Sequence, residues 1–264
     1  MDVRSLAFRT DLALLVLGGS LVEDHDTHLV VRTPANPGFH WGNFYLLASP
    51  PAAGDVDALL TAYDADFPES THRALGVDGT ADQSAALAPL VAAGPALDAG
   101  TVMTARSVHA PPRPNTEAEL RPLTSDDDWA KRVEVSAACH PEYPREQYLD
   151  FATRKATYER GLVEAGHGAW WGAFLDGRLV SGMGLMRAGA GLARFQSVET
   201  HPDFRGRGLA GTLVHHVGAW GLSELGARTL VMVADPEYLA ARIYRSCGFV
   251  DSEVQTQLVQ LTRS

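Results

Sequence analysis

The sequence has little cysteine and no long apolar segment. Its two cysteines, Cys139 and Cys247, are too few for a disulfide framework or a cysteine-rich metal cluster, which suits a reducing cytoplasm. No apolar stretch approaches the ~20 residues that a membrane-spanning helix requires, and Asp2 stands where a signal peptide would be basic. We therefore expect a cytoplasmic protein that crosses no membrane and holds no metal.

Positive charge is also scarce. The 264 residues carry a formal net charge of −10, and residues 1–117 alone contain 6 Lys+Arg against 14 Asp+Glu. Such a surface makes nucleic acid a poor partner and weakly favours a cationic substrate. With 45% hydrophobic residues, the chain can build a core in one large domain or in two small ones.

The common nucleotide-binding motifs are absent, but a different anion-binding turn is present. The chain lacks the Walker A lysine and the G-x-G-x-x-G spacing of dinucleotide folds. Residues 201–210 instead form an arginine- and glycine-rich turn between a strand-like run at 193–200 and a helix-like run at 209–225. A helix that begins in such a turn presents unpaired N–H groups and the positive end of its dipole. Glycines there can adopt positive φ, and arginines add charge, so the turn predicts a phosphate or diphosphate site.

The turn contains Arg205-Gly-Arg-Gly-Leu-Ala210, an R-x-x-G-x-A pattern that resembles the pyrophosphate loop of the GNAT acetyltransferase superfamily. The likeness continues in order along the chain. An apolar strand at Thr229–Ala234 is followed by Pro236–Phe249, which is similar to the family's second signature and ends in a tyrosine, three residues and Gly-Phe. The resemblance covers residues 118–264 and implies that this half binds acetyl-CoA as a co-substrate.

The order of elements also resembles one complete GNAT domain. A proline-rich linker at 111–117 precedes a strand and a helix that Ser125 can cap. A second helix is predicted at about 144–164, and Asp176-Gly177 predicts a type I′ hairpin turn. The motif strand, a helix, a strand, a helix and a last strand at 254–261 complete the domain at 118–264.

Residues 1–110 repeat part of this order without the phosphate loop. Pro50 and Pro51 stand at the corresponding turn and have no N–H to offer an anion, while Asp55 and Asp57 add negative charge. We therefore expect an α/β fold of two tandem GNAT-like domains, each a mixed, mostly antiparallel sheet flanked by helices. The N-terminal domain is then a degenerate copy, and an unrelated α/β domain is the alternative.

The resemblance implies a role for individual residues. Backbone groups of Val198, Glu199 and Thr200 would bind the pantetheine arm, and Tyr244 matches the tyrosine that protonates the CoA sulfur. Glu237 stands where the family often has asparagine, and an ionised carboxylate cannot donate a hydrogen bond to the cofactor. The diphosphate would lie on the loop residues Arg205, Gly206, Arg207, Gly208, Leu209, Ala210 and Gly211.

The general base is the least determined part of the site. Glu199 is the nearest carboxylate on the motif strand, and His201 lies two residues later on the same face. His140 and Glu142 are weaker candidates. The sequence thus predicts an N-acyltransferase that moves an acetyl group to a primary amine of a small molecule or peptide. A catalytically weak CoA-binding sensor or interaction protein with the same fold is the alternative, and a homodimer is compatible with either.

Overall fold

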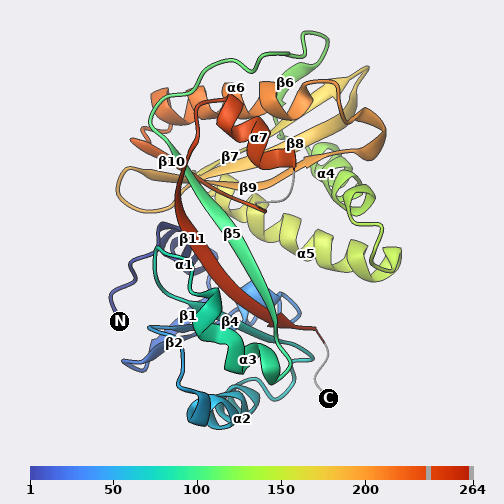
Figure 1. Ribbon diagram of the computed structural model, residues 1–264. Helices are drawn as coiled ribbons and strands as arrows, with labels where there is room; N and C mark the ends of the chain where they lie inside the picture. Colours follow the sequence, from blue (N-terminus) through green and yellow to red (C-terminus); the bar gives the residue numbers. More distant parts are fainter. Residues whose placement is uncertain (236–238, 262–264) are drawn as a thin grey trace. The chain divides into compact units, whose positions relative to one another are not determined.

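A computed structural model describes residues 1–235 and 239–261 (Figure 1). The chain divides into two compact units, the first built on residues 1–102 and the second on residues 103–232. Residues 239–250 belong to the second unit, whereas the last strand belongs to the first from Asp251 onward. No helix in the described part of the chain is both long and apolar enough to cross a membrane.

The second unit is a five-stranded sheet with helices on both faces. Its elements are, in chain order, β6 (Glu119–Pro122), α4 (Asp126–Cys139), α5 (Arg145–Glu164), β7 (Gly168–Leu175), β8 (Arg178–Arg187), β9 (Leu192–Thr200), the 3₁₀ turn Pro202–Phe204, α6 (Leu209–Ser223), β10 (Thr229–Ala234) and α7 (Leu239–Ser246). The strands lie in the order β10-β9-β8-β7-β6. The β9–β10 pair is parallel, and the other neighbours are antiparallel.

Two adjacent tryptophans in β7 mark the two helical layers. The ring of Trp170 is fully buried and lies 6.1 Å from that of Trp129 in α4. The ring of Trp171 lies 5.7 Å from that of Trp220 in α6. Successive strand residues point to opposite faces of a sheet. The α4–α5 pair therefore covers one face and α6 covers the other (Figure 1).

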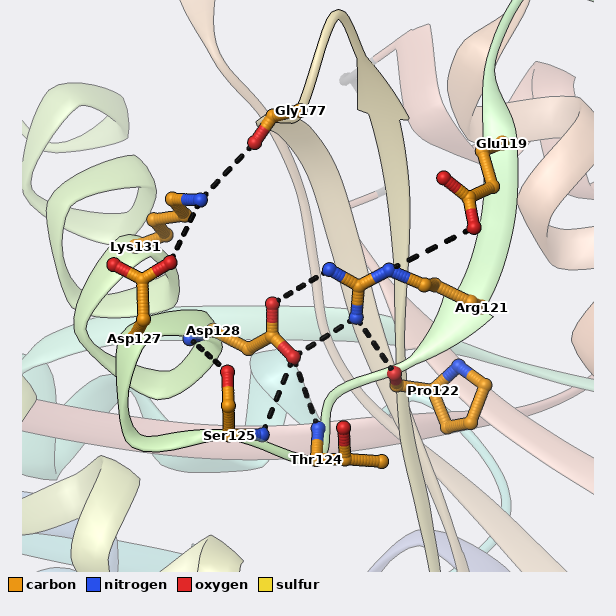
Figure 2. Close-up of polar contacts among 9 residues, drawn as sticks. All are labelled: Glu119, Arg121, Pro122, Thr124, Ser125, Asp127, Asp128, Lys131 and Gly177. Atoms are coloured by element: carbon orange, nitrogen blue, oxygen red, sulfur yellow. Dashed lines mark hydrogen bonds and ion pairs between the residues drawn. The ribbon is translucent and has the colours of Figure 1, made fainter.

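The start of α4 is fixed to β6 by a polar network that Figure 2 shows. Ser125 caps the helix, and its hydroxyl accepts from the backbone N–H of Asp128 at 3.1 Å. The Asp128 carboxylate accepts from the backbone N–H groups of Ser125 and Thr124, and from both terminal nitrogens of Arg121 at 2.7 and 2.8 Å. The hydrogen bonds from Arg121 are the largest of the effects that lower the pKa of Asp128. The predicted cap at Ser125 is confirmed.

The β7–β8 hairpin turns as the sequence predicts. Asp176 and Gly177 have φ of 48° and 74°. A type I′ turn requires positive φ at both central residues, which an Asp-Gly pair tolerates. The turn is therefore of the expected type.

The first unit is also a sheet with helices. Its elements are α1 (Leu6–Leu17), β1 (Leu21–Asp24), β2 (His28–Arg32), the 3₁₀ turns His40–Gly42, Ala53–Asp55 and Ser84–Leu87, β3 (Phe44–Leu47), α2 (Val56–Asp66), β4 (Arg73–Val77), α3 (Ala88–Ala92), β5 (Ala96–Ala105) and β11 (Val250–Gln260). The strand order is β1-β2-β3-β4-β11-β5. Tyr45, Tyr63, Leu75 and Leu258 contribute to one buried apolar cluster, and Phe8, Phe44 and Leu46 to a second.

The last strand differs from the sequence expectation, which placed it in the C-terminal domain. Most of β11 belongs to the first unit, where it pairs antiparallel with β4 from Thr256 opposite Val77 to Gln260 opposite Arg73. Leu258 is fully buried in the first unit's core. Alternation of polar and apolar residues predicts a half-buried strand but does not say which sheet receives it.

The helix α1 was not predicted from the sequence. Its Phe8 and Leu15 are buried in the second apolar cluster of the first unit. The backbone N–H of Leu6 donates to the Glu253 carboxylate at 2.8 Å, and Gln255 Nε2 donates to Asp11 at 3.0 Å. Asp11 interrupts the apolar run in the sequence but pairs with a β11 residue in the fold. A partner more than 240 residues away in the chain therefore satisfies this carboxylate of α1.

Candidate functional site

The turn before α6 has the backbone geometry of an anion site. Gly206 and Gly208 have φ of 76° and 75°, as predicted, and Gly208 is the N-cap residue of α6. In the described part of the chain, the backbone N–H groups of Gly206 to Gly211 donate to no acceptor. Six such donors at the positive end of a helix dipole suit a phosphate or diphosphate.

The two arginines of the turn already contact protein groups. Arg205 Nε donates to the backbone carbonyl of Thr200 at 3.2 Å. Arg207 pairs with Glu117 at 2.7 Å, and its guanidinium lies 5.6 Å from the centre of the Phe204 ring. The backbone donors therefore carry the anion-binding character of the turn, and the arginines add positive charge beside it.

The predicted linker packs against this turn. The backbone N–H of Asn115 donates to Thr212 Oγ1 at 2.8 Å, and its side-chain amide donates to the carbonyl of Arg207 at 3.0 Å. A Cβ added to Gly208 would lie 2.3 Å from the Arg113 carbonyl oxygen. The segment thus belongs to the second unit and touches the turn, which explains why only glycine fits at 208.

The strand β9 diverges from β10 next to the turn. The parallel register between them runs only from Leu192 to Arg194, whereas β9 continues to Thr200. On its other side, β9 pairs with β8 through a bulge in which Ser197 and Val198 stand opposite Met183 alone. Ser197 has φ of 41°, in the left-handed region that favours glycine. The bulge redirects the end of β9 just before the anion-binding turn.

Glu199 lies at this end of β9, and its side chain is only 13% exposed. Its carboxylate accepts from Ser136 Oγ at 2.8 Å and lies 3.6 Å from His140 Nε2, both in or at the end of α4. Burial opposes its charge, yet the pKa of Glu199 lies below its ordinary value. The close contact with His140 and the positive charges of Arg132 and Lys155 lower that pKa. Glu199 is therefore a buried, ionised carboxylate.

His140 forms the accessible end of this pair. Its side chain is 38% exposed, and its Nδ1 lies 3.1 Å from Glu142. The ion pair with Glu199 is the largest effect that raises the pKa of His140, and Glu142 adds to it. The His140 ring stacks on Tyr148 with centres 4.8 Å apart, and Tyr148 stacks on Tyr143 at 5.7 Å. Burial raises the pKa of Tyr148 to about 12, so its hydroxyl stays protonated.

The sequence analysis named Glu199 and His201 as candidate general bases on one strand face, and His140 and Glu142 as weaker candidates. In the structure, the side-chain contacts of His201 are with Arg178, Asp203 and Phe204. The strand ends at Thr200 and the chain turns, so strand alternation no longer applies at position 201. No sequence signal reports that His140, the C-cap residue of α4, folds back onto β9.

The remaining residues that the sequence singles out lie in α7 or next to it in the chain. Tyr244 is 5% exposed, and its ring is 6.4 Å from that of Phe249, with which it forms part of the core. Cys247 is fully buried, and its thiol donates to the carbonyl of Gly211 at 3.5 Å. Burial raises the pKa of the Cys247 thiol, which makes it a poor nucleophile. Glu237 lies outside the described residues.

Among its described residues, the first unit has neither feature of the site. Its parallel pair, β3 and β4, keeps register from Tyr45 to Leu47, so the strands do not diverge along β3. The turn after β3 contains Pro50 and Pro51, which have no N–H to donate. Only the second unit therefore combines an open strand pair with a row of unpartnered donors among the residues described.

The comparisons with known proteins agree with this geometry. A model of the acetyltransferase (GNAT) family, whose members use acetyl-CoA, matches residues 129–249. No curated protein matches the chain. The match begins inside α4 and ends at Phe249, directly before β11.

Solved structures share the fold over nearly the whole chain. A conserved protein of unknown function from Staphylococcus epidermidis superposes with a TM-score of 0.70 at 12% identity, covering 93% of this chain and 95% of that one. A GCN5-related N-acetyltransferase from Kribbella flavida gives 0.65 at 14% identity, covering 97% and 96%. A tandem GNAT protein from the clavulanic acid biosynthesis pathway gives 0.59 at 15% identity, covering 95% and 88%. The chain therefore has a tandem GNAT fold, and its residues 129–249 are a GNAT acetyltransferase domain.

Proposed function

We propose that the protein transfers an acetyl group from acetyl-CoA to a primary amine of a small molecule or peptide. One observation carries the proposal. The backbone N–H groups from Gly206 to Gly211, which have no acceptor among the described residues, follow the strand that holds the buried carboxylate of Glu199. A diphosphate site and a buried anionic group beside one open strand are what acetyl-CoA and an acceptor amine require.

The proposed steps follow from the residues on this strand. The diphosphate lies on the turn, and the pantetheine arm follows the unpaired edge of β9. The N–H near Val198 stabilises the thioester oxygen as it becomes negative. The neutral amine attacks the thioester carbon, the C–S bond breaks, and CoA leaves as a thiolate. Tyr244 gives that thiolate a proton.

The proton of the amine goes to the Glu199–His140 pair, directly or through water. Glu199 is already ionised, and His140 is the exposed member that connects it to solvent. Glu199 can accept a proton from the ammonium group of the acceptor, and His140 can release a proton to solvent. The acceptor amine then becomes neutral. The proposed general base is thus the Glu199–His140 pair. Glu199 keeps the role of candidate general base that the sequence analysis gave it.

Release of free CoA from acetyl-CoA in the presence of a panel of amines tests the proposal. We expect at least one primary amine to accelerate CoA release at least tenfold over acetyl-CoA alone. Slow hydrolysis that no amine accelerates would instead support a CoA-binding sensor. No binding of acetyl-CoA at all would contradict both functions. The cytoplasmic location and a homodimer remain predictions.

A further inference from the structure

The bulge of β9 contains a residue in an unfavourable conformation that a lysine contacts. Ser197 has φ of 41°, and a residue with a Cβ pays an energetic cost for the left-handed region. Lys155 Nζ in α5 donates to Ser197 Oγ at 2.9 Å. A hydrogen bond at this position favours the left-handed conformer over the extended one that a strand residue would otherwise adopt.

Lys155 also lies beside a buried ion pair between α5 and α4. Lys155 Nζ lies 4.0 Å from Glu159, one turn later in α5. Glu159 pairs with Arg132 of α4 at 2.5 Å, and both side chains are almost fully buried. The Arg132 guanidinium lies 4.3 Å from the centre of the Trp170 ring in β7. The ammonium that meets Ser197 is therefore anchored to two helices and to the sheet.

We propose that Lys155 is a positioning residue that braces the β9 bulge through Ser197. This role rests on the proposed function, because the bulge aims two groups of that mechanism: the N–H near Val198 and the carboxylate of Glu199. A φ of 41° favours glycine, and the hydrogen bond from Lys155 stabilises this conformation for a serine instead. Without it, Ser197 would relax toward extended backbone, and the residues after it would rotate.

A pair of substitutions tests the brace. Lys155→Met removes the ammonium but keeps most of the length of the side chain, and we expect kcat to fall about tenfold. Ser197→Gly removes the cost of positive φ, so that the bulge no longer needs the brace. Lys155→Met in the Ser197→Gly background should therefore lower kcat less than twofold. Arg154→Met, one residue away and paired only with Asp150 among the described residues, is the control and should change nothing.

The charge of Lys155 is separable from its hydrogen bond. The pKa of Glu199 is lowered by its contact with His140, by the charges of Arg132 and Lys155, and by the hydrogen bond from Ser136. Loss of the Lys155 charge should shift the pH profile of kcat whether residue 197 is serine or glycine. Loss of the hydrogen bond should lower the maximal kcat only when residue 197 is serine. Lys155→Arg keeps a charged donor and should retain most of the activity.

Hydrogen exchange provides a readout that needs no acceptor amine. In Lys155→Met, amides of residues 195–200 should exchange at least fivefold faster, while the rest of the second unit stays unchanged. The same substitution in the Ser197→Gly background should have less than half that effect. If wild-type protein transfers no acetyl group, the proposed function fails, and this exchange comparison alone decides whether Lys155 braces the bulge.

Three results would count against the proposal. In the first, Lys155→Met has wild-type kcat and wild-type exchange at residues 195–200. In the second, Lys155→Met loses as much activity in the Ser197→Gly background as in the wild type, which would show that the lysine acts by another route. General unfolding of Lys155→Met, seen as fast exchange throughout the second unit, would also count against a local brace.

Discussion

At the scale of single residues, Glu199 and His140 form an ion pair whose charge state depends on pH. The pKa of Glu199 is lowered and that of His140 is raised. A lowered carboxylate pKa contributes stability above the unfolded pKa and loses it as pH falls through the folded pKa. A raised histidine pKa contributes stability at low pH and loses it as pH rises through the folded pKa. The pair therefore contributes most at mildly acidic pH, between the unfolded pKa of a glutamate, about 4.3, and that of a histidine, about 6.5.

Tyr244→Phe tests the chemistry at the residue scale. The substitution removes one hydroxyl and keeps the ring that packs near Phe249, so CoA affinity should survive. If the hydroxyl protonates the leaving thiolate, kcat should fall by about 10²-fold near neutral pH, within the range for a positioned proton donor. A thiol with an ordinary pKa of about 8.5 can leave unaided at higher pH, so the defect should shrink as pH rises.

The measurement is kcat against pH from 6 to 9 for wild type and variant. Tyr45→Phe, at a buried tyrosine of the first unit, is the matched control and should leave kcat unchanged. Equal turnover of Tyr244→Phe and wild type across this range would leave Tyr244 with a packing role only.

At the scale of elements, the turn before α6 can be tested at one glycine without disturbing its packing. A Cβ at Gly206 would meet no atom within 4 Å, whereas one at Gly208 would collide with the Arg113 carbonyl. Asparagine and aspartate tolerate the left-handed backbone of Gly206 comparably and differ in charge. Gly206→Asp should therefore weaken CoA binding at least tenfold, as expected when a charge opposes a charge-assisted contact.

Gly206→Asn is the neutral counterpart and should weaken CoA binding less than threefold. Both affinities are measured by calorimetry with CoA. Equal weakening by the two variants would assign the effect to shape rather than charge. Unchanged affinity in both would mean that the diphosphate does not lie on this turn.

The start of α4 is a second element whose stability rests on one carboxylate. Asp128 accepts from two backbone N–H groups and from Arg121 (Figure 2). Asp128→Asn removes its charge and should lower the free energy of unfolding by about 1–3 kcal/mol at pH 7. Because the pKa of Asp128 is depressed in the folded state, this difference should be complete above about pH 5 and shrink below about pH 4.

Urea denaturation at pH 7 and at pH 3.5 checks this expectation. Asp127→Asn is the neighbouring control, since its side chain is 73% exposed and pairs with Lys131. It should change the free energy of unfolding by less than about 0.5 kcal/mol. A difference for Asp128→Asn that is the same at both pH values would contradict the role of its charge.

At the scale of the whole molecule, two units of related fold differ in the features that a CoA site would require. Only in the second do the described residues combine diverging parallel strands with free N–H donors at a helix start. The first keeps β3 and β4 in register and has Pro50 and Pro51 at the corresponding turn. We expect calorimetry with CoA to give one site per chain. A stoichiometry of two would contradict the degenerate state of the first unit.

Much of the second unit could be predicted from the sequence because its signals are local. The Asp176-Gly177 turn, the cap at Ser125 and the positive φ of Gly206 and Gly208 each depend on a few neighbouring residues. Backbone sterics and capping act over three or four residues. These features can therefore be predicted without knowledge of the rest of the fold. The position of Glu199 on the motif strand followed from the same local pattern.

The tertiary structure alone decided the contacts between distant residues. The sequence does not say that β11 joins β4, that α1 packs beneath it, that His140 rather than His201 contacts Glu199, or that Lys155 reaches Ser197. Alternation fixes which side chains of a strand are buried but not the neighbour that buries them. A polar residue such as Asp11 interrupts an apolar pattern in the sequence. Only the fold shows the distant residue with which it forms a hydrogen bond. The sequence thus determined the turns, caps and motif strand, and the packing of remote segments determined which groups meet at the site.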